Sequence, residues 1–447
     1  MITYTFDPNI SLFESLYRCI RDDILAGRLA PNEKLPSKRQ LSQHLQVSKS
    51  TVEVAYGQLL AEGYIYSKEK VGYFVEALAP RPFSAPGPVL GEPPEPPIPT
   101  PEDHLFPFSV WTRLLRRVMA DYGAKILAPL PTAGVPELRR GIARYLRGNR
   151  QLSVSPEQIV VGAGTDFLYN VLIQLLGRDL RYGVEDPGYT KISAVYRANG
   201  INPILAPLDG DGVTVEALEN ADVVHLSPAH HYPTGIITPV RRRQQLLEWA
   251  GSEKWIIEDD YDSEFRFTGR PIPPMTAMDK HGRVIYINSF SKTLAPGLRI
   301  SYMVLPKPLL EQFQKKLGFY ACTVPGFEQY TLAKFLEEGY FEKHLNRMKK
   351  HYRDQRLELL KALAPLEPRC KVLGSGGGLH FLLVLPQVPS DEEIQSLAPN
   401  GLRVQRLSHY YAGPAPEFAS LTLVADYSAG GSGSALAAAL DALLRQW

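Results

Sequence analysis

The chain has 447 residues, of which 44% are hydrophobic and 21% are charged, and its formal net charge is +2 at pH 7. This composition is that of a globular protein with two or three domains, and it excludes collagen-like, low-complexity and disulfide-scaffold classes. No stretch has the length of a membrane span, and the first residues lack a signal-peptide pattern. The three cysteines lie far apart and outside any metal-ligand spacing, so we expect reduced thiols in a cytoplasmic protein and no metal site.

The first 78 residues predict three helices and a hairpin. Apolar residues recur at helical spacing over 12–25, and Gly27 ends that helix. Ser37 and Ser48 fit the N-cap positions of helices over 38–45 and 49–62. The segments 64–66 and 72–75 are rich in residues that favour strands, and they are joined by a short polar stretch, which predicts a hairpin.

A proline-rich stretch follows and divides the chain. Proline removes backbone donors and disfavours helix, so we expect an extended linker over 79–103. The predicted domains are therefore 1–78 and 104–447, joined by this linker.

Three helices, a tight turn before the third and a β wing form a winged helix-turn-helix, and the string LPSKRQLSQHLQVSKSTVEVAYGQLLAEGYIYSKEKVGYFV resembles the GntR-type DNA-binding domain. Acidic and basic residues are equally numerous in this unit, but no acid lies between residues 34 and 51, which leaves a local basic face. The alternative is a small helical module for protein contacts. The resemblance implies DNA contacts from the start of the third helix, the start of the second helix and the wing, namely Lys49, Ser50, Thr51, Lys38, Arg39, Lys68 and Lys70.

The second unit alternates strand and helix patterns. Apolar runs predict strands over 159–161, 181–184, 223–227, 255–258, 284–288 and 300–305, with helical stretches between many of them. This alternation predicts an α/β domain with a parallel sheet, and such sheets bind ligands at the carboxyl ends of their strands.

The most informative segment, SFSKTLAPGLR, follows one of these strands. Lys292 can form a Schiff base with an aldehyde, and the hydroxyls of Ser289 and Ser291 with the guanidinium of Arg299 can hold a phosphate. An aldehyde and a phosphate on one ligand describe pyridoxal 5′-phosphate (PLP). The segment resembles the PLP-lysine motif of fold-type I aminotransferases.

That resemblance implies roles for further residues. Gly164, Thr165 and Asp166 open a helix after a strand and correspond to the phosphate cradle. Tyr189 corresponds to the aromatic residue that covers the pyridine ring. In the segment IIEDDYDSEFR, Asp259 corresponds to the partner of the ring nitrogen and Tyr261 to a hydrogen-bond donor for the 3′-oxygen.

Two departures concern catalysis and the effector. Tyr232 stands where catalytic members usually carry an asparagine before Pro-Thr-Gly. The stretch 421–424 contains no arginine, whereas the family usually places there an arginine that holds a carboxylate. Lys191 is a partial replacement for that arginine, and the sequence does not place Arg403 or Arg406.

The order of the two units is similar to that of MocR/GabR-type PLP-dependent transcriptional regulators. The resemblance implies a homodimer that binds a double-stranded DNA operator and responds to an amine, an amino acid or PLP itself. Two alternatives stay open, namely a working aminotransferase with an accessory winged helix and a regulator that senses PLP alone. The departures at Tyr232 and 421–424 favour little or no turnover.

Overall fold

The computed structural model describes residues 4, 6, 10–77, 105–267, 272–367, 369–374, 376–397, 402–428 and 430–447, so the expected linker over 79–103 lies outside them. The chain divides into two compact units, residues 1–97 and 98–447. Among the residues that the structure describes, no helix combines the length and apolar character needed to cross a membrane.

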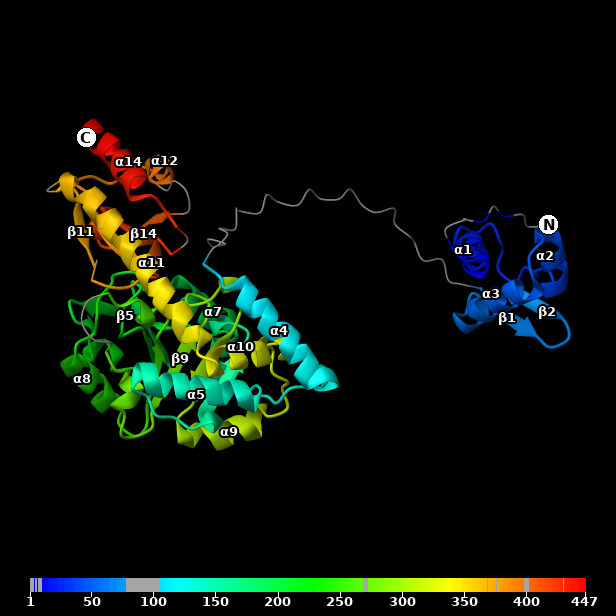
Figure 1. The fold of residues 1–447 in the computed structure, drawn as a ribbon, viewed down its shortest axis with the longest axis horizontal. Coiled ribbons are helices and arrows are strands. Elements are labelled where there is room, and N and C mark those ends of the chain that lie inside the picture. Colours follow the sequence, from blue (N-terminus) through cyan, green and yellow to red (C-terminus); the bar gives the residue numbers. More distant parts are fainter. Residues whose placement is uncertain are drawn as a thin grey trace. The chain divides into compact units, whose positions relative to one another are not determined.

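The small unit contains three helices and a two-stranded antiparallel sheet (Figure 1). Ser37 begins α2 with a reciprocal capping box, in which Ser37 and Gln40 each accept a hydrogen bond from the other's backbone amide. Apolar side chains of all three helices and both strands form one core. The elements are α1 (Leu12–Leu25), α2 (Lys38–Leu45), α3 (Lys49–Ala61), β1 (Ile65–Lys68) and β2 (Gly72–Val75).

The large unit is built on an eight-stranded sheet with the order β3-β10-β9-β8-β7-β4-β5-β6. The strands from β9 to β5 in this order are parallel, as predicted. The expectation of a parallel strand is wrong for β10, which runs antiparallel to β3 and β9, because the short connection after β9 returns the chain directly. The strands are β3 (Ile159–Gly162), β4 (Tyr182–Asp186), β5 (Ile204–Asp209), β6 (Gly212–Val213), β7 (Val223–Leu226), β8 (Trp255–Asp259), β9 (Val284–Ser289) and β10 (Ser301–Val304).

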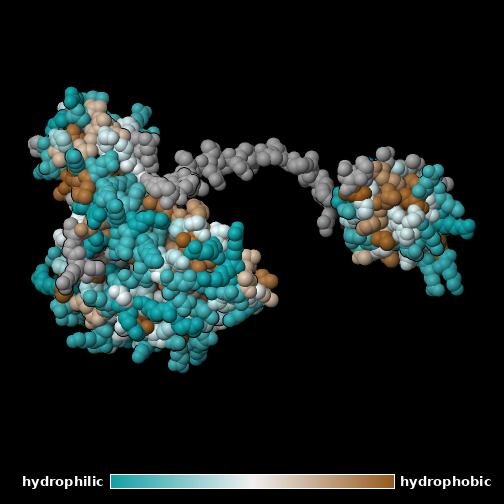
Figure 2. Space-filling view, viewed as in Figure 1, coloured by the Kyte–Doolittle hydropathy of each residue, from teal (hydrophilic) through white to brown (hydrophobic). Residues whose placement is uncertain are grey.

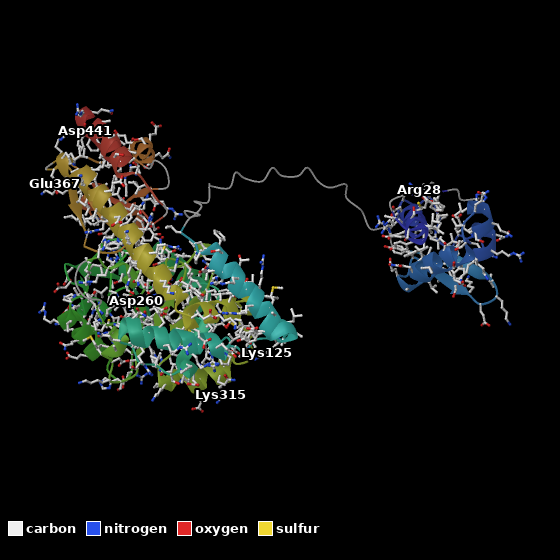
Figure 3. All side chains as sticks on the ribbon, viewed as in Figure 1. Arg28, Lys125, Asp260, Lys315, Glu367 and Asp441 are labelled. Atoms are coloured by element: carbon white, nitrogen blue, oxygen red, sulfur yellow. The ribbon has the colours of Figure 1, made fainter. Side chains whose placement is uncertain are left out.

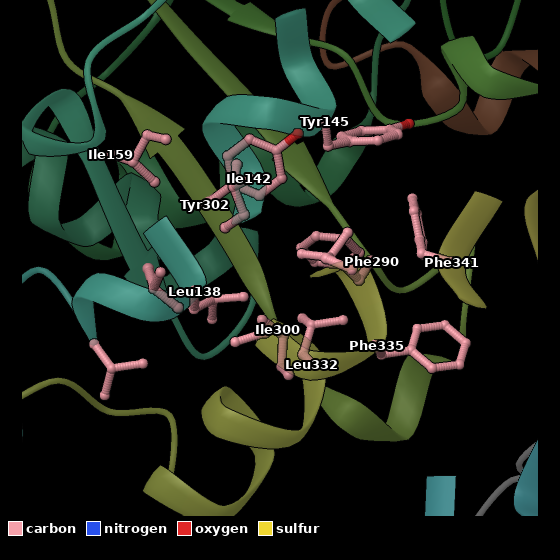
Figure 4. Close-up of a cluster of buried hydrophobic side chains, with 14 of the residues drawn as sticks. Leu138, Ile142, Tyr145, Ile159, Phe290, Ile300, Tyr302, Leu332, Phe335 and Phe341 are labelled. Carbon is pink, nitrogen blue, oxygen red and sulfur yellow. The ribbon is translucent and has the colours of Figure 1, made fainter. Parts of the chain in front are cut away.

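Helices cover both faces of this sheet, because successive strand residues point to opposite sides. Ile285 and Ile287 pack in the cluster that includes α6, α7 and α9, whereas Tyr286 between them packs in the cluster of α4, α5, α10 and α11. Figure 4 shows part of the second cluster, with Tyr286's neighbour Tyr302 among the labelled side chains. The helices are α4 (Phe108–Tyr122), α5 (Pro136–Arg150), α6 (Thr165–Leu176), α7 (Thr190–Ala198), α8 (Val240–Ala250), α9 (Lys307–Leu317), α10 (Gly326–Glu337) and α11 (Tyr340–Leu363).

A second sheet, which the sequence did not predict, forms the C-terminal part of the large unit. Its four antiparallel strands have the order β11-β12-β14-β13, and α11 and α14 pack against each other beside it (Figure 1). Strand β14 brings Asp426 opposite both His380 of β12 and Arg403 of β13. The elements are β11 (Lys371–Leu373), β12 (His380–Val384), α12 (Asp391–Ser396), β13 (Arg403–Arg406), α13 (Glu417–Ser420), β14 (Thr422–Asp426) and α14 (Gly433–Gln446).

A buried polar network fixes the strand ends beneath the site. Arg150 donates to Asp260 at 2.5 Å, and the hydroxyl of Tyr286 donates to the same carboxylate at 2.6 Å. Asp260 lies inside the large unit, where an unpaired charge would be costly (Figure 3). The network therefore anchors the segment after β8 that carries Asp259 and Tyr261.

Candidate functional site

A cavity of about 260 Å³ lies at the carboxyl ends of the parallel strands. It collects the predicted site residues from separate loops, as expected for a parallel sheet. Ten of the sequence-predicted residues line it, namely Thr165, Asp166, Tyr189, Lys191, Asp259, Tyr261, Ser289, Ser291, Lys292 and Arg299. The remaining one, Gly164, lies against Arg299.

One end of the cavity is formed by the start of α6. Gly164 is its N-cap residue with φ +94°, and a Cβ there would collide with the guanidinium of Arg299. Asp166 accepts hydrogen bonds from Arg299 at 2.7 Å and from Lys191 at 3.0 Å. Burial alone raises the pKa of an acid, but these two cations hold the pKa of Asp166 below its usual value. This end thus combines helix-start amides with two cations, a combination that suits an anion.

Two serines close the same end. The hydroxyl of Ser301 donates to Ser289 at 2.9 Å, and Ser289 donates to Ser291 at 2.9 Å. The backbone amide of Ser291 also donates to the Ser289 hydroxyl at 3.1 Å. These bonds fix both predicted hydroxyls at the cavity wall.

Asp259 lies at the end of β8, deep in the cavity. The hydroxyl of Tyr169 donates a hydrogen bond to its Oδ2, and His225 Nε2 lies 3.7 Å from the same oxygen. Its other oxygen, Oδ1, is buried and has no hydrogen-bond partner among the described residues. A buried carboxylate oxygen without a hydrogen-bond donor is costly in free energy, so this atom marks a place for a ligand group that donates a hydrogen bond.

Aromatic side chains form one wall. Tyr189 is partly exposed, and its ring lies edge-on to Tyr232 with centroids 6.1 Å apart. The Tyr232 hydroxyl lies 2.8 Å from that of Tyr410, and burial raises the pKa of Tyr232. Beneath this wall, burial raises the pKa of Glu185 to about 8, and the carboxyl accepts a hydrogen bond from the Ser227 amide.

Tyr261 lines the cavity, but its hydroxyl lies 3.2 Å from His230 Nδ1. His230 Nδ1 is also 2.9 Å from Asp262, and the His380 ring lies 4.7 Å from that of His230. His230, Asp262 and His380 are buried, and one possible ligand atom of each lies within 4.8 Å of the others. No cysteine takes part in this cluster, and no sequence spacing indicated it.

Lys292 extends from the loop after β9 towards β14. Its ammonium group donates to the Ser428 hydroxyl at 2.9 Å and lies 3.9 Å from Asp426 Oδ2. Burial alone raises the pKa of Asp426, but the charge of Lys292 and hydrogen bonds from Ser428 lower it. Strand β14 therefore brings a negative charge to the cavity.

The two arginines that the sequence left unplaced, Arg403 and Arg406, differ in their exposure and in their contacts. Arg403 lines the cavity and is exposed, whereas Arg406 is bonded to Asp391 and to the Pro389 carbonyl. Thr422, in the stretch without an arginine, is buried and donates to the Phe418 carbonyl at 2.7 Å.

These residues fit pyridoxal 5′-phosphate. The start of α6 with Arg299 suits its phosphate, the unpartnered Oδ1 of Asp259 suits its protonated ring nitrogen, and Lys292 suits its aldehyde.

In the small unit, the residues predicted to contact DNA lie in the first turns of α2 and α3, at the end of β1 and in the hairpin turn. Arg39, Lys49, Lys68 and Lys70 are exposed. The Ser48 hydroxyl lies 2.7 Å from that of Ser50 and 2.8 Å from that of Thr51, so the cap orders both side chains.

Lys38 differs from the other basic side chains on this surface. It donates to Glu53 at 2.9 Å and lies over the ring of Tyr73. Its charge therefore already has a partner inside the small unit.

Sequence reasoning missed several cavity residues. Tyr169 follows Thr165 by four residues on α6, so helical spacing from the cradle was a usable signal. Asp426, Ser428 and His380 come from the C-terminal sheet, whose pairing no local pattern indicated.

Comparison with known proteins places both units. Residues 12–75 match the model for bacterial regulatory proteins of the gntR family, and residues 100–435 match aminotransferase class I and II. The uncharacterized HTH-type transcriptional regulator YdeL of Bacillus subtilis is 37% identical over 90% of each chain. The probable rhizopine catabolism regulatory protein MocR of Rhizobium meliloti is 33% identical over 79% of this chain and 78% of its own. The pyridoxine biosynthesis regulator PdxR of Corynebacterium glutamicum is 32% identical over 88% and 87%.

Solved structures resemble the large unit. An archaeal alanine:glyoxylate aminotransferase has a TM-score of 0.68 at 25% identity and covers 78% of this chain and 89% of its own. A kynurenine aminotransferase of Pyrococcus horikoshii, in complex with PMP, has a TM-score of 0.65 at 25% identity and covers 78% and 90%.

Proposed function

Because the chain belongs to the MocR-type HTH transcriptional regulators, which join a gntR-family domain to an aminotransferase class I and II domain, we propose that it is a PLP-dependent DNA-binding regulator. The family and the fold class predicted from the sequence are confirmed. In this proposal the small unit binds an operator, and the large unit binds PLP and an amine effector.

One observation carries the cofactor assignment. A single cavity brings together the Lys292 amine, the unpartnered buried oxygen of Asp259 and the start of α6 beside Arg299. Bound PLP supplies an aldehyde that condenses with amines and a ring that withdraws electrons. Each of its three polar parts has a partner of suitable charge in this cavity.

The residues of the chain then have separate tasks. Lys292 would hold the cofactor through its aldehyde, and Asp259, which Tyr169 and His225 keep in place, would hold a proton on the ring nitrogen. Arg299, Ser289 and Ser291, with the amides of Thr165 and Asp166, would hold the phosphate beside Gly164, whose own amide donates to the Gly162 carbonyl, and Tyr189 would cover the ring. Tyr261 reaches the 3′-oxygen if its hydroxyl turns away from His230.

Turnover is expected to be slow. Transamination requires the substrate carboxylate to be held so that the α-hydrogen points at the base. Tyr232 occupies the wall where an asparagine is usual, and β14 presents Asp426 rather than an arginine. The second candidate, a working aminotransferase, is favoured by the same cavity. It predicts rapid, complete conversion of the cofactor by a common amino acid in stopped-flow mixing, whereas a regulator shows a spectral change without turnover.

A homodimer is part of the proposal, and exposed apolar side chains support it. Phe108 and Met119 on α4, Leu127 shortly after it and Phe319 after α9 are each more than half exposed. Figure 2 shows hydrophobic residues on the visible surface near the end of α4. Light scattering of the purified chain is expected to give twice the monomer mass of 49.9 kDa.

A DNA-shift assay on the region upstream of the chain's own gene tests the proposal. The full-length protein is expected to shift this DNA, with PLP and then amines changing the affinity. Lys49→Ala is expected to weaken the shift because it removes a cation from the start of α3, whereas Lys315→Ala on the large unit is a matched control expected to have no effect. An operator shift that survives removal of residues 1–103 would contradict the division of labour.

A further inference from the structure

Four aspartates line the cavity, and three of them have a side-chain partner within 3.0 Å or a place in the proposed cofactor site. Asp166 has Arg299 and Lys191, and Asp262 has His230 Nδ1 at 2.9 Å. Asp259 has the Tyr169 hydroxyl and, in the proposed function, the ring nitrogen of the cofactor. The fourth is Asp426, and its position differs from the others.

Asp426 presents one carboxylate oxygen to the cavity. Its Oδ1 accepts the Ser428 amide at 2.8 Å. Its Oδ2 lies 3.9 Å from Lys292 Nζ, beyond a hydrogen bond, and the Ser428 side chain also hydrogen-bonds to the carboxylate, which leaves part of its acceptor capacity unused. The side chain is 15% exposed, and that exposed part borders the cavity. Asp426 is therefore a largely buried carboxylate with part of its acceptor capacity left for a ligand.

The groups around Asp426 leave it negatively charged. Lys292 and Ser428 lower the pKa of Asp426, although burial opposes them. His380, opposite it on β12, is neutral because burial holds the pKa of its imidazole well below the usual value. Arg403, opposite it on β13, is exposed, so water screens its charge. Asp262, the other buried carboxylate away from the cofactor positions, lies 2.9 Å from His230 Nδ1, so Asp426 is the carboxylate with the less close partner in this part of the cavity.

We propose that Asp426 determines effector specificity and selects an amine that carries a second positive charge, such as a linear diamine. This inference rests on the proposed function, in which the first amine would replace Lys292 on the cofactor aldehyde and release the Lys292 side chain as a free amine. The second ammonium group binds Oδ2, and the buried Nε2 of His380, which lacks a partner among the described residues, accepts from it in the Nδ1–H tautomer.

The same geometry disfavours an effector carboxylate. A carboxylate near Asp426 would meet a like charge in a poorly solvated site. Thr422, in the stretch where an arginine is usual, has its hydroxyl bonded to a carbonyl and adds no positive charge. The carboxylate of Asp426 thus favours a positively charged ligand group at this wall.

Three probes of equal chain length separate the possibilities: putrescine, butylamine and γ-aminobutyrate, whose far ends are positive, neutral and negative. Each is titrated into the PLP-loaded full-length protein, and the dissociation constant is read from the change in cofactor absorption. Putrescine is expected to bind at least about 10-fold more tightly than γ-aminobutyrate, because a hydrogen bond to a charged group contributes about 1.5–3 kcal/mol.

Two variants test the assignment. Asp426→Asn is expected to remove the preference for putrescine while keeping PLP, DNA binding and butylamine affinity. The matched control, Arg403→Gln on the adjacent strand, is expected to keep the preference. If Asp426→Asn does not fold, the ranking of the three probes on the wild-type protein decides.

The inference is overturned if PLP-loaded protein does not respond to putrescine, if γ-aminobutyrate binds as tightly, or if Asp426→Asn keeps the preference. Loss of PLP from Asp426→Asn also overturns it, because Asp426 would then hold the cofactor. A wild-type protein that takes up no PLP, or does not shift DNA, counts against the proposed function instead.

Discussion

The two ends of the cavity are each built around an aspartate, but they differ in how its charge is met. Asp166 has two cations within 3.0 Å, and Gly164 beside it leaves no room for a side chain. Asp426 has one cation at 3.9 Å, beyond hydrogen-bond distance, and accepts the Ser428 amide at 2.8 Å. The first end is preorganised for a group of fixed size, which suits the phosphate of the proposed cofactor. At the second end, the negative charge of Asp426 is available to a ligand group of opposite charge. Substitutions there can therefore change which ligand is accepted.

The largest effect is expected for Lys292→Ala, which removes the amine that lies between the two ends of the cavity. Borohydride reduction of PLP-treated wild-type protein is expected to fix the cofactor on Lys292, and the variant is expected to lose this adduct completely. Mass spectrometry of the peptides locates the adduct. Lys191→Ala is the matched control, because Lys191 also lines the cavity, and this variant is expected to keep the adduct. An adduct on Lys191 in the Lys292→Ala variant, formed with the wild-type yield, would contradict the assignment.

A second substitution acts at the cofactor side alone. Asp259→Asn is expected to weaken PLP binding by roughly 10- to 100-fold, because a hydrogen bond between charged groups is lost. Absorption titration with PLP measures it. The comparison predicts unchanged PLP affinity for Asp426→Asn, and equal losses in the two variants would show that the ends are not separate.

A third test concerns the preorganised end itself. Gly164→Ala is expected to destabilise the large unit by about 1–3 kcal/mol and to weaken PLP binding, because it combines positive φ with a collision against Arg299. Denaturant unfolding measures the first effect. Gly177→Ala, at the other end of α6, has positive φ without any neighbour in the way. Gly177→Ala is expected to lose stability and keep its affinity for PLP. If it lost as much PLP affinity as Gly164→Ala, backbone strain alone would explain the effect of Gly164→Ala.

The smallest expected effect is the pH dependence of the Asp166 cluster. The pKa of Asp166 is lowered in the folded state, so its ion pairs stabilise the fold at pH values above the ordinary aspartate pKa of about 3.9. This contribution is lost as the pH falls through the lowered pKa. Because the group is partly exposed, the contribution is below about 1 kcal/mol. Unfolding of wild type and Asp166→Asn over an acid series tests this, and a stability difference that grows towards acid would contradict it.

Local signals account for what the sequence predicted. Helix α2 begins at Lys38 as expected, because Ser37 and Gln40 cap it within four residues. Strands β8 and β9 are buried apolar runs, and the residues after them meet because parallel strands share an edge. These features depend on neighbours in sequence or on a general rule of sheet geometry.

The parts that were not predicted depend on distant pairing. The direction of β10 is set by its hydrogen bonds to β3 and β9, not by its own residues. Tyr169 meets Asp259 across 90 residues, and Lys292 meets Ser428 across 136. No local pattern in the last part of the chain indicated that β14 would carry a carboxylate into the cavity.

The ion pair between Lys38 and Glu53 has a consequence for how the small unit responds to salt. A cation that meets a DNA phosphate releases condensed counterions, and each such contact adds about 0.9 to the slope of log affinity against log salt concentration. Lys38 is already neutralised by Glu53, so its contribution to that slope is small, whereas Arg39, Lys49, Lys68 and Lys70 are exposed. Lys38→Met is therefore expected to leave the number of released ions nearly unchanged. Glu53→Gln is expected to raise that number, because it frees a fifth positive charge for the DNA backbone.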